Sequence, residues 1–126
     1  MIAYLDTQAL VWLSQGSLTG LRTKVDRLLR QADLLFSPMV LLELEFLYEI
    51  NRVKLPARDI QRKVEQETGA RLCDLPFPAI ASAALEEKWT RDPFDRLIVA
   101  NAKANGFACL VSADEKIALH YPRTVW

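Results

Sequence analysis

Five acidic residues stand on an otherwise apolar helix face, at the end of a strand or at the start of a helix: Asp6, Glu43, Asp92, Asp95 and Asp114. Carboxylates that meet in one place repel each other unless divalent cations bind between them. Two such ions, held about 3.5–4 Å apart, can clamp the attacking and leaving oxygens of a phosphodiester. The chain has a single histidine, His120, so any metal would be held mainly by oxygen. Oxygen ligands favour Mg²⁺ or Mn²⁺.

Asp6 and Asp114 each follow a strand-like segment, IAYL in the first case and FACLVS in the second. Binding sites in parallel sheets form at the carboxyl ends of strands. Both positions also have a local explanation. Asp6 is a favoured N-cap for the next helix. Ser112 and Glu115 have the spacing of a capping box, which would leave Asp114 free.

Glu43 lies in a helical run from Met39 to Ile50 that is otherwise rich in apolar residues. With about 100° between successive residues, it shares one side of the helix with Met39, Phe46, Leu47 and Ile50. Glu45 and Glu49 lie on a different side, which is an ordinary polar face. An ionised glutamate among apolar side chains costs free energy unless a cation or a donor compensates it. Glu43 is therefore expected either to hold a metal or to pair with an arginine.

The segment RDPFDRLIVANAKANG contains Asp92 and Asp95 at the start of an expected helix. Pro93 suits the first helical position and Asp92 the N-cap, while the helix dipole favours Asp95 in the first turn. The face of Asp95 continues with apolar residues: Ile98, Val99 and Ala102. Asp95 should therefore lie at the rim of the core. Arg96 points to another face, as a candidate for phosphate contact or for ordinary solvation.

Strand-like and helical segments alternate along the chain. Strands are expected at residues 2–5, near Leu35, Leu72 and Leu110, and in the terminal RTVW. Helices are expected at residues 7–14, 21–31, 39–50, 57–68, 78–88 and 93–105. This alternation favours an α/β fold with a mainly parallel sheet, and 126 residues suit one domain, residues 1–126.

The helix at residues 57–68 is highly polar, with only Ile60 and Val64 as a narrow apolar stripe. It is expected to be a solvated surface helix that packs weakly beside the preceding helix.

Charge and composition limit the function classes. Lys plus Arg and Asp plus Glu both total 16, so any basic surface for nucleic acid must be a local patch. Cys73 and Cys109 are expected to be buried reduced thiols. The N-terminus lacks a basic region before an apolar run, and no apolar stretch is long enough to span a bilayer. The expectation is a cytoplasmic protein without a membrane partner.

In order along the chain, the segments YLDTQALVWL, SPMVLLELEFL, RDPFDRLIVANAKANG and LVSADEKI resemble the PIN domain. More narrowly, they resemble the VapC-like toxins of type II toxin–antitoxin systems, over nearly the whole of residues 2–126. The resemblance implies a three-layer α/β/α sandwich with a central parallel sheet. It also implies Mg²⁺- or Mn²⁺-dependent endonucleolytic cleavage of single-stranded RNA, a homodimer and a small antitoxin partner.

Residue by residue, the resemblance implies that Asp6, Glu43, Asp95 and Asp114 are the four catalytic, metal-binding acids. Asp92 matches an additional acid of this subgroup, which the resemblance implies is a further metal ligand or, instead, a helix cap. Thr7 and Ser112 match hydroxyl positions that orient an acid or a water. Gln8 and Arg91 depart from the family pattern, in which histidine is frequent nearby, and this affects substrate contacts rather than the metal site.

Three other interpretations use the same residues. A receiver-type phosphate acceptor has adjacent acids after an early strand, whereas Asp6 has no acidic neighbour. A phosphohydrolase with an aspartyl nucleophile in a DxD motif would need an acid where Gln8 stands. A catalytically inactive PIN-like module would bind RNA or protein, although here all the acids are present.

Overall fold

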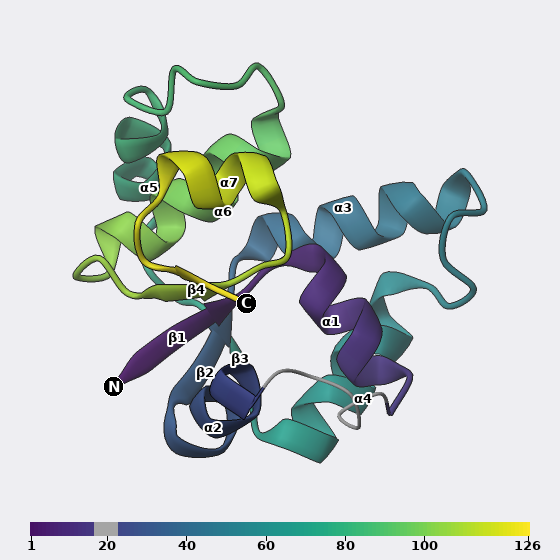
Figure 1. Cartoon of the computed structure of the whole chain (residues 1–126). Coiled ribbons are helices and arrows are strands. Elements are labelled where there is room, and N and C mark those ends of the chain that lie inside the picture. The colour runs from purple at the N-terminus through teal and green to yellow at the C-terminus, as the bar shows by residue number, and fades with distance from the viewer. Residues whose placement is uncertain (17–22) are drawn as a thin grey trace.

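A computed structural model describes residues 1–16 and 23–126, and its centre is a sheet of parallel strands (Figure 1). The strands are β1 (Ile2–Leu5), β2 (Asp33–Phe36), β3 (Arg71–Leu72), β4 (Cys109–Val111) and β5 (Thr124–Val125). Their spatial order is β3-β2-β1-β4-β5, and every pairing is parallel. The predicted α/β class with a parallel sheet is confirmed.

Helices fill the connections between the strands. They are α1 (Thr7–Ser14), α2 (Thr23–Gln31), α3 (Pro38–Glu49), α4 (Ala57–Thr68), α5 (Phe77–Ala84), α6 (Pro93–Ala104) and α7 (Glu115–His120). The predicted start of α2 at Leu21 lies outside the described residues. Helix α5 ends at Ala84 rather than at Lys88. The chain turns after the helix, and the side chain of Glu87 then points inward and pairs with Lys103. The short helix α7 was not predicted as an element.

The order of the strands creates one point where the connections diverge. From β1 the chain moves outward to β2 and β3, and it then crosses back to β4 on the other side of β1. Leu5 and Val111 pair in register at the carboxyl ends of β1 and β4. Crevices for ligands form at such a switch point. This order also differs from the 2-1-3-4-5 order of receiver domains, so the receiver interpretation is wrong.

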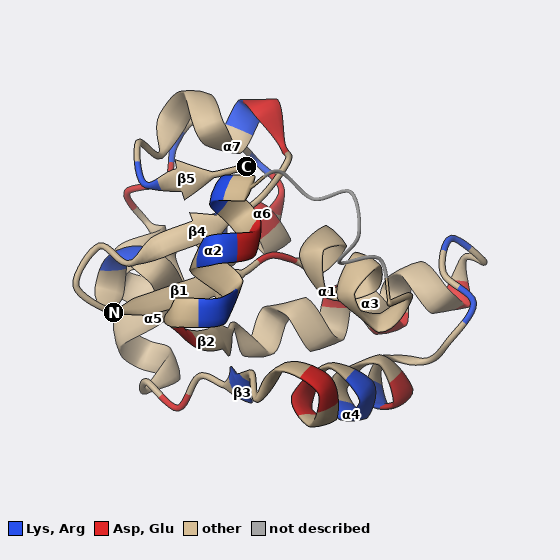
Figure 2. Cartoon of the chain, turned by 60° about the horizontal axis from the view of Figure 1, so that its bottom comes forward, with Lys and Arg blue, Asp and Glu red and all other residues tan. Residues whose placement is uncertain are grey.

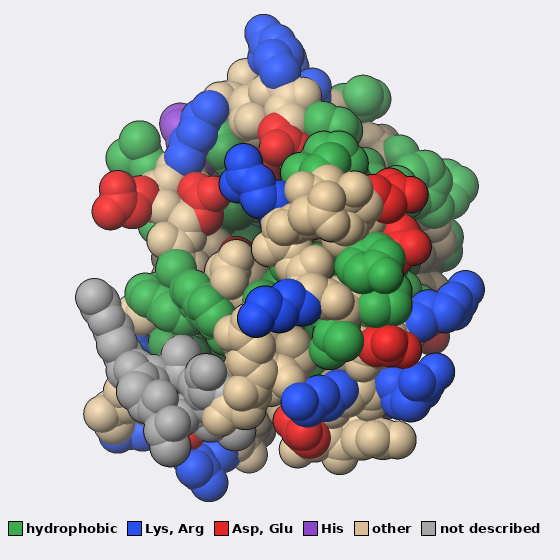
Figure 3. All heavy atoms as spheres, turned by 90° about the vertical axis from the view of Figure 1, so that its right-hand side faces the viewer, with side chains coloured by type: hydrophobic (Ala, Val, Ile, Leu, Met, Phe, Trp, Pro, Cys, Tyr) green, Lys and Arg blue, Asp and Glu red, His purple; other side chains and the backbone are tan. Residues whose placement is uncertain are grey.

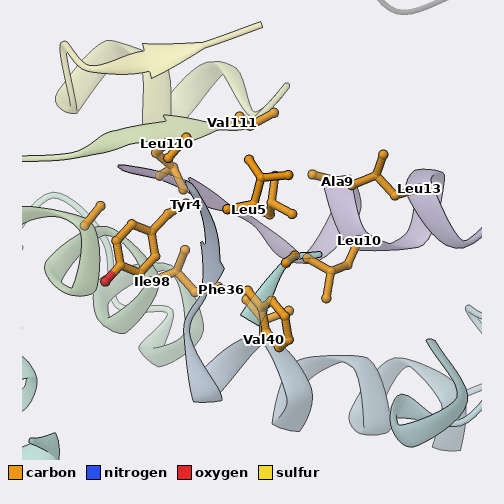
Figure 4. Close-up of a cluster of buried hydrophobic side chains, with 14 of the residues drawn as sticks. Tyr4, Leu5, Ala9, Leu10, Leu13, Phe36, Val40, Ile98, Leu110 and Val111 are labelled. Atoms are coloured by element: carbon orange, nitrogen blue, oxygen red, sulfur yellow. The ribbon is translucent and has the colours of Figure 1, made fainter. Parts of the chain in front are cut away.

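The core lies on both faces of the sheet, because side chains alternate along β1. In Figure 4, Tyr4 points toward Ile98 of α6, whereas Leu5 points toward α1. The Tyr4 hydroxyl accepts hydrogen bonds from Asn101 and Asn105 of α6 at 3.1 and 2.8 Å. Helices therefore cover both faces of the sheet, as the predicted three-layer α/β/α sandwich requires.

Cys73 and Cys109 are buried and free, as predicted. Within the described part of the chain, no helix has the length and apolarity needed to cross a bilayer.

Helix α4 packs more closely than its polar composition predicts. Its outward side carries alternating acidic and basic residues (Figure 2), but Ile60 and Val64 are buried in the main core. The helix contacts both α1 and α3. Glu45 of α3 also accepts a hydrogen bond from the Ala57 amide at 3.1 Å, which satisfies a free N–H at the start of α4. The expected pairing with the preceding helix is present, whereas the expectation of weak packing is wrong.

Candidate active site

A pocket of about 450 Å³ brings together Asp6, Glu43, Asp95 and Asp114. Asp6 follows β1 and Asp114 follows β4, so the topology of the sheet places them beside the switch point. Glu43 comes from the middle of α3, and Asp95 comes from the first turn of α6. The four predicted acids therefore meet in space although they belong to four separate parts of the chain.

Asp6 and Asp114 also cap helices, as their local sequence allows. Oδ1 of Asp6 accepts a hydrogen bond from the Ala9 amide at 2.8 Å. Oδ1 of Asp114 accepts hydrogen bonds from the Lys116 and Ile117 amides at 2.8 and 3.0 Å. Capping uses only one oxygen of each carboxylate, so the second oxygen takes no part in it. The local and the chemical explanations of these acids are therefore compatible.

The predicted capping box of Ser112 and Glu115 is wrong. Asp114 itself is the N-cap of α7, and the Ser112 hydroxyl accepts a hydrogen bond from the Asp114 amide at 3.1 Å. The sequence pattern was misleading because serine and aspartate are both strong caps, and only the backbone path decides which of them precedes the first helical turn.

Asp92 is the N-cap of α6, as predicted. Its Oδ1 accepts hydrogen bonds from the Phe94 and Asp95 amides at 2.8 and 3.3 Å. Asp92 is not among the residues that line the pocket. Its charge nevertheless acts on the pocket, because it raises the pKa of both Glu43 and Asp95.

Two hydroxyl groups hold acids of the pocket. The Thr7 hydroxyl donates a short hydrogen bond to Oε1 of Glu43, which joins α1 to α3. The Ser112 hydroxyl, almost fully buried, lies close enough to Asp6 to lower its pKa. Each of these two residues therefore lies beside an acid of the pocket.

The pKa values of three acids in the pocket are raised above their ordinary values. Burial is the largest cause and raises the pKa of Asp6 to about 6, against hydrogen bonds from Ser112 and the Ala9 amide. Burial also raises the pKa of Asp95 to about 7, with further contributions from the charges of Asp92 and Asp114. The pKa of Glu43 is raised by burial as well, in opposition to its bond from Thr7. A bound cation would offset both the burial and the repulsion.

The donor set suits Mg²⁺ or Mn²⁺ by its chemistry, because it consists of carboxylate oxygens. Within residues 1–16 and 23–126, however, no three Asp, Glu, His or Cys side chains are already arranged to hold one ion. The acids surround a common pocket without closing on one point. Asp6 and Asp114 each keep an oxygen outside their capping bonds, so ligation of an ion would not require the helix caps to be broken.

Arg96 does not contribute to the pocket. Its Nε and Nη2 donate hydrogen bonds to the carbonyl oxygens of Ala84 and Leu85 at 3.3 and 3.4 Å. The guanidinium therefore caps the C-terminal end of α5. Its expected phosphate contact has no support in this arrangement. No local pattern around Arg96 indicates this role, because its partner carbonyl groups belong to the preceding helix and the residue after it.

The pocket also contains Gln8, which the sequence connected with substrate contacts, and residues that the motifs did not single out for a role: Trp12, Leu47, Ala113 and Ile117. Gln8 and Trp12 are separated by one helical turn on α1, which begins at the residue after Asp6. Side chains four residues apart lie on the same side of a helix. Because α1 begins directly after Asp6, the four-residue spacing of Gln8 and Trp12 is the sequence signal that could have placed both residues beside this acid.

Comparisons with known proteins agree with this geometry. Residues 3–121 match the family model of the PIN domain. A solved structure of VapBC2 from Rickettsia felis, bound to a DNA fragment from its promoter, contains a chain that is 20% identical. The alignment covers 99% of this chain and 96% of that one, with a TM-score of 0.63.

A second solved structure is VapC20 of Mycobacterium tuberculosis, described as a Sarcin-Ricin loop cleaving toxin. It is 17% identical and gives a TM-score of 0.57, with 94% of each chain covered. No curated protein sequence matches the chain significantly. The structural likeness concerns the fold, whereas the family model covers nearly the whole sequence. On that match, this chain belongs to the PIN domain family.

Proposed function

We propose that this protein is an Mg²⁺- or Mn²⁺-dependent endoribonuclease that cleaves single-stranded RNA and acts as the toxin of a toxin–antitoxin pair. The observation that carries the proposal is the meeting of Asp6, Glu43, Asp95 and Asp114 in one pocket at the switch point of the sheet. Membership of the PIN family and the likeness of the fold to VapC20 support a nuclease of this kind.

In this proposal Asp6, Glu43 and Asp95 would hold divalent metal, and Asp114 would help to hold a second ion or would position the attacking water. The ions, when bound, would supply Lewis-acid stabilisation to a phosphodiester. Thr7 keeps Glu43 in place, and Ser112 with the Ala9 amide keeps Asp6 in place. Water attacks phosphorus in line with O3′, the P–O3′ bond breaks, and O3′ takes up a proton. The products are a 5′-phosphate and a 3′-hydroxyl.

The test is cleavage of a fluorescent single-stranded RNA by purified protein in Mg²⁺, in Mn²⁺ and in excess EDTA. Asp6→Asn and Asp95→Asn should each lower the rate by at least about 100-fold, since even groups that only support metal ligands cost 10–100-fold when they are lost. Asp59→Asn is the control, because Asp59 is an exposed carboxylate on α4 that pairs with Arg62. Cleavage that persists in EDTA, or at the parental rate in Asp6→Asn, would contradict the proposal.

The same experiment separates the remaining alternative, a PIN-like module that binds without catalysis. Such a module would retain RNA or protein binding in EDTA and would show no cleavage with either metal. The four acids of the pocket favour the enzyme, because a module that only binds RNA has no need of acids that repel phosphate.

We further propose a homodimer, a cytoplasmic location and a cognate antitoxin, in line with the antitoxin complex formed by VapBC2. Large apolar side chains are exposed on α3, which such contacts would cover: Leu42 and Phe46. On the face drawn in Figure 3, acidic and basic side chains are interspersed with hydrophobic ones. A mixed surface of this kind is more typical of an interface with a protein than of an interface with nucleic acid, which would be continuously basic.

A further inference from the structure

Trp12 is the aromatic residue that lies beside the carboxylates. It lines the same pocket as Asp6, Glu43, Asp95 and Asp114, and its side chain is only partly buried. The position places a large flat π-surface next to the groups that are proposed to act on a phosphodiester.

The Trp12 indole is held in place from behind. Its ring lies 4.6 Å from the ring of Trp126, centroid to centroid, with the planes tilted by 37°. Trp12 also borders a small apolar space that is lined by Leu13, Val25 and Val111. A ring fixed by such neighbours loses little conformational entropy when a second flat group packs on it.

Gln8 lies one helical turn before Trp12 and lines the pocket as well. Its side chain is exposed, and its amide can both donate and accept hydrogen bonds. The side of α1 that borders the acids therefore offers a stacking surface and an amide together. Bases of single-stranded RNA are recognised by this combination, in which one face stacks and one edge bonds.

We propose that Trp12 is a stacking platform for one base next to the scissile phosphate, with the Gln8 amide at the edge of that base. This inference rests on the proposed ribonuclease function and adds to it a base-binding subsite. Stacking of a base on an aromatic ring contributes about 1–3 kcal/mol. A platform of this kind would help to decide which phosphodiester lies over the acids.

The experiment pairs variants of Trp12 with substrates that lack single bases. The cleavage site of the parent protein is first mapped on a pool of short single-stranded RNAs. One abasic residue is then moved through the positions around that site, and kcat/KM is measured for the parent, Trp12→Phe and Trp12→Leu. Phenylalanine keeps a stacking ring, whereas leucine keeps apolar packing without one. Phe77→Ala is the control, because Phe77 is an exposed aromatic residue that does not line the pocket.

For the parent, Phe77→Ala and Trp12→Phe, we expect one abasic position to lower kcat/KM by about 5- to 150-fold, which corresponds to the stacking range. For Trp12→Leu, the same abasic position should make little further difference, because its stacking partner is absent. An equal abasic effect in the parent and in Trp12→Leu, with both proteins folded by circular dichroism, would overturn the subsite while leaving the nuclease intact. If the parent cleaves no RNA at all, both the function and the subsite are overturned.

Discussion

Asp6 and Asp114 each cap a helix and line the pocket with the same carboxyl group. Oδ1 of each caps a helix, and the group as a whole faces the pocket. Ser112 connects the two acids, because its hydroxyl lowers the pKa of Asp6 and accepts a hydrogen bond from the Asp114 amide. A single buried hydroxyl thus helps to set the relative position of two acids from neighbouring strand ends.

We predict that Ser112→Ala lowers the free energy of unfolding by about 1–3 kcal/mol, since it leaves buried polar groups without a partner. The loss should be larger at pH 8 than at pH 5, because the hydrogen bond favours the ionised form of Asp6. Urea unfolding at both pH values measures it. Ser82→Ala is the control, because Ser82 is exposed on α5. A loss no larger than in that control would show that Ser112 does not support the acids.

That four acids line one pocket could be predicted from the sequence, because Glu43 is anomalous on an apolar helix side and the others follow strands or begin a core-packed helix within an ordered set of motifs. Arg96 could not be placed in this way, and Trp12 could be placed only through its spacing on the helix that follows Asp6. A long basic side chain has no local signature that tells a solvated head from one that binds distant carbonyl groups. Trp12 fits the apolar pattern of α1, and its place beside the pocket depends on how α1 leaves β1.

At the scale of the elements, α4 shows how one polar contact can fix a helix that is otherwise rich in charge. Pro56 precedes α4 and provides no side-chain cap, but Glu45 reaches from α3 to the Ala57 amide. In the sequence, Glu45 was assigned to a solvated polar face together with Glu49. The structure corrects that assignment for Glu45, because its side chain joins α3 to the start of α4.

We predict that Glu45→Ala lowers the free energy of unfolding by about 0.5–2 kcal/mol, which is the usual cost of losing a helix cap. Glu49→Ala is the matched control on the same helix, because Glu49 is exposed. Thermal unfolding followed by circular dichroism compares the two variants. Equal stability of both variants would mean that the bond to Ala57 contributes nothing to the packing of α4.

The types of most elements were predictable, whereas the order of the strands was not. Hydrophobic periodicity is a local signal and identifies helices such as α1 and α4 with their observed bounds. Parallel strand pairing joins residues far apart in sequence, as in the pairing of Leu5 with Val111. No local pattern states that β4 lies beside β1, although this pairing is what brings Asp6 and Asp114 together.

At the scale of the whole molecule, the pocket opposes folding when no cation is present. Asp6 and Asp95 have pKa values of about 6 and about 7, raised from an ordinary 3.8. The folded protein therefore binds more protons than the unfolded chain between about pH 4 and pH 7. The contribution of these two groups to stability is fully present below pH 4 and is lost as the pH rises through their folded pKa values.

We therefore predict that Asp95→Asn, which imitates the protonated acid, has nearly the parental stability at pH 4 but exceeds it increasingly toward pH 8. Urea unfolding in EDTA measures the difference in the free energy of unfolding between the two proteins. The pH dependence of all other ionisable groups, which both proteins share, cancels in this difference. Asp59→Asn, at an exposed carboxylate, should show no such trend. Added Mg²⁺ should stabilise the parent at pH 8 by about 2.7 kcal/mol at 100 times its Kd, and Asp95→Asn by less. An Asp95→Asn variant that is no more stable than the parent at pH 8 would mean that the acids do not oppose folding, and the reason for a cation in the pocket would be removed.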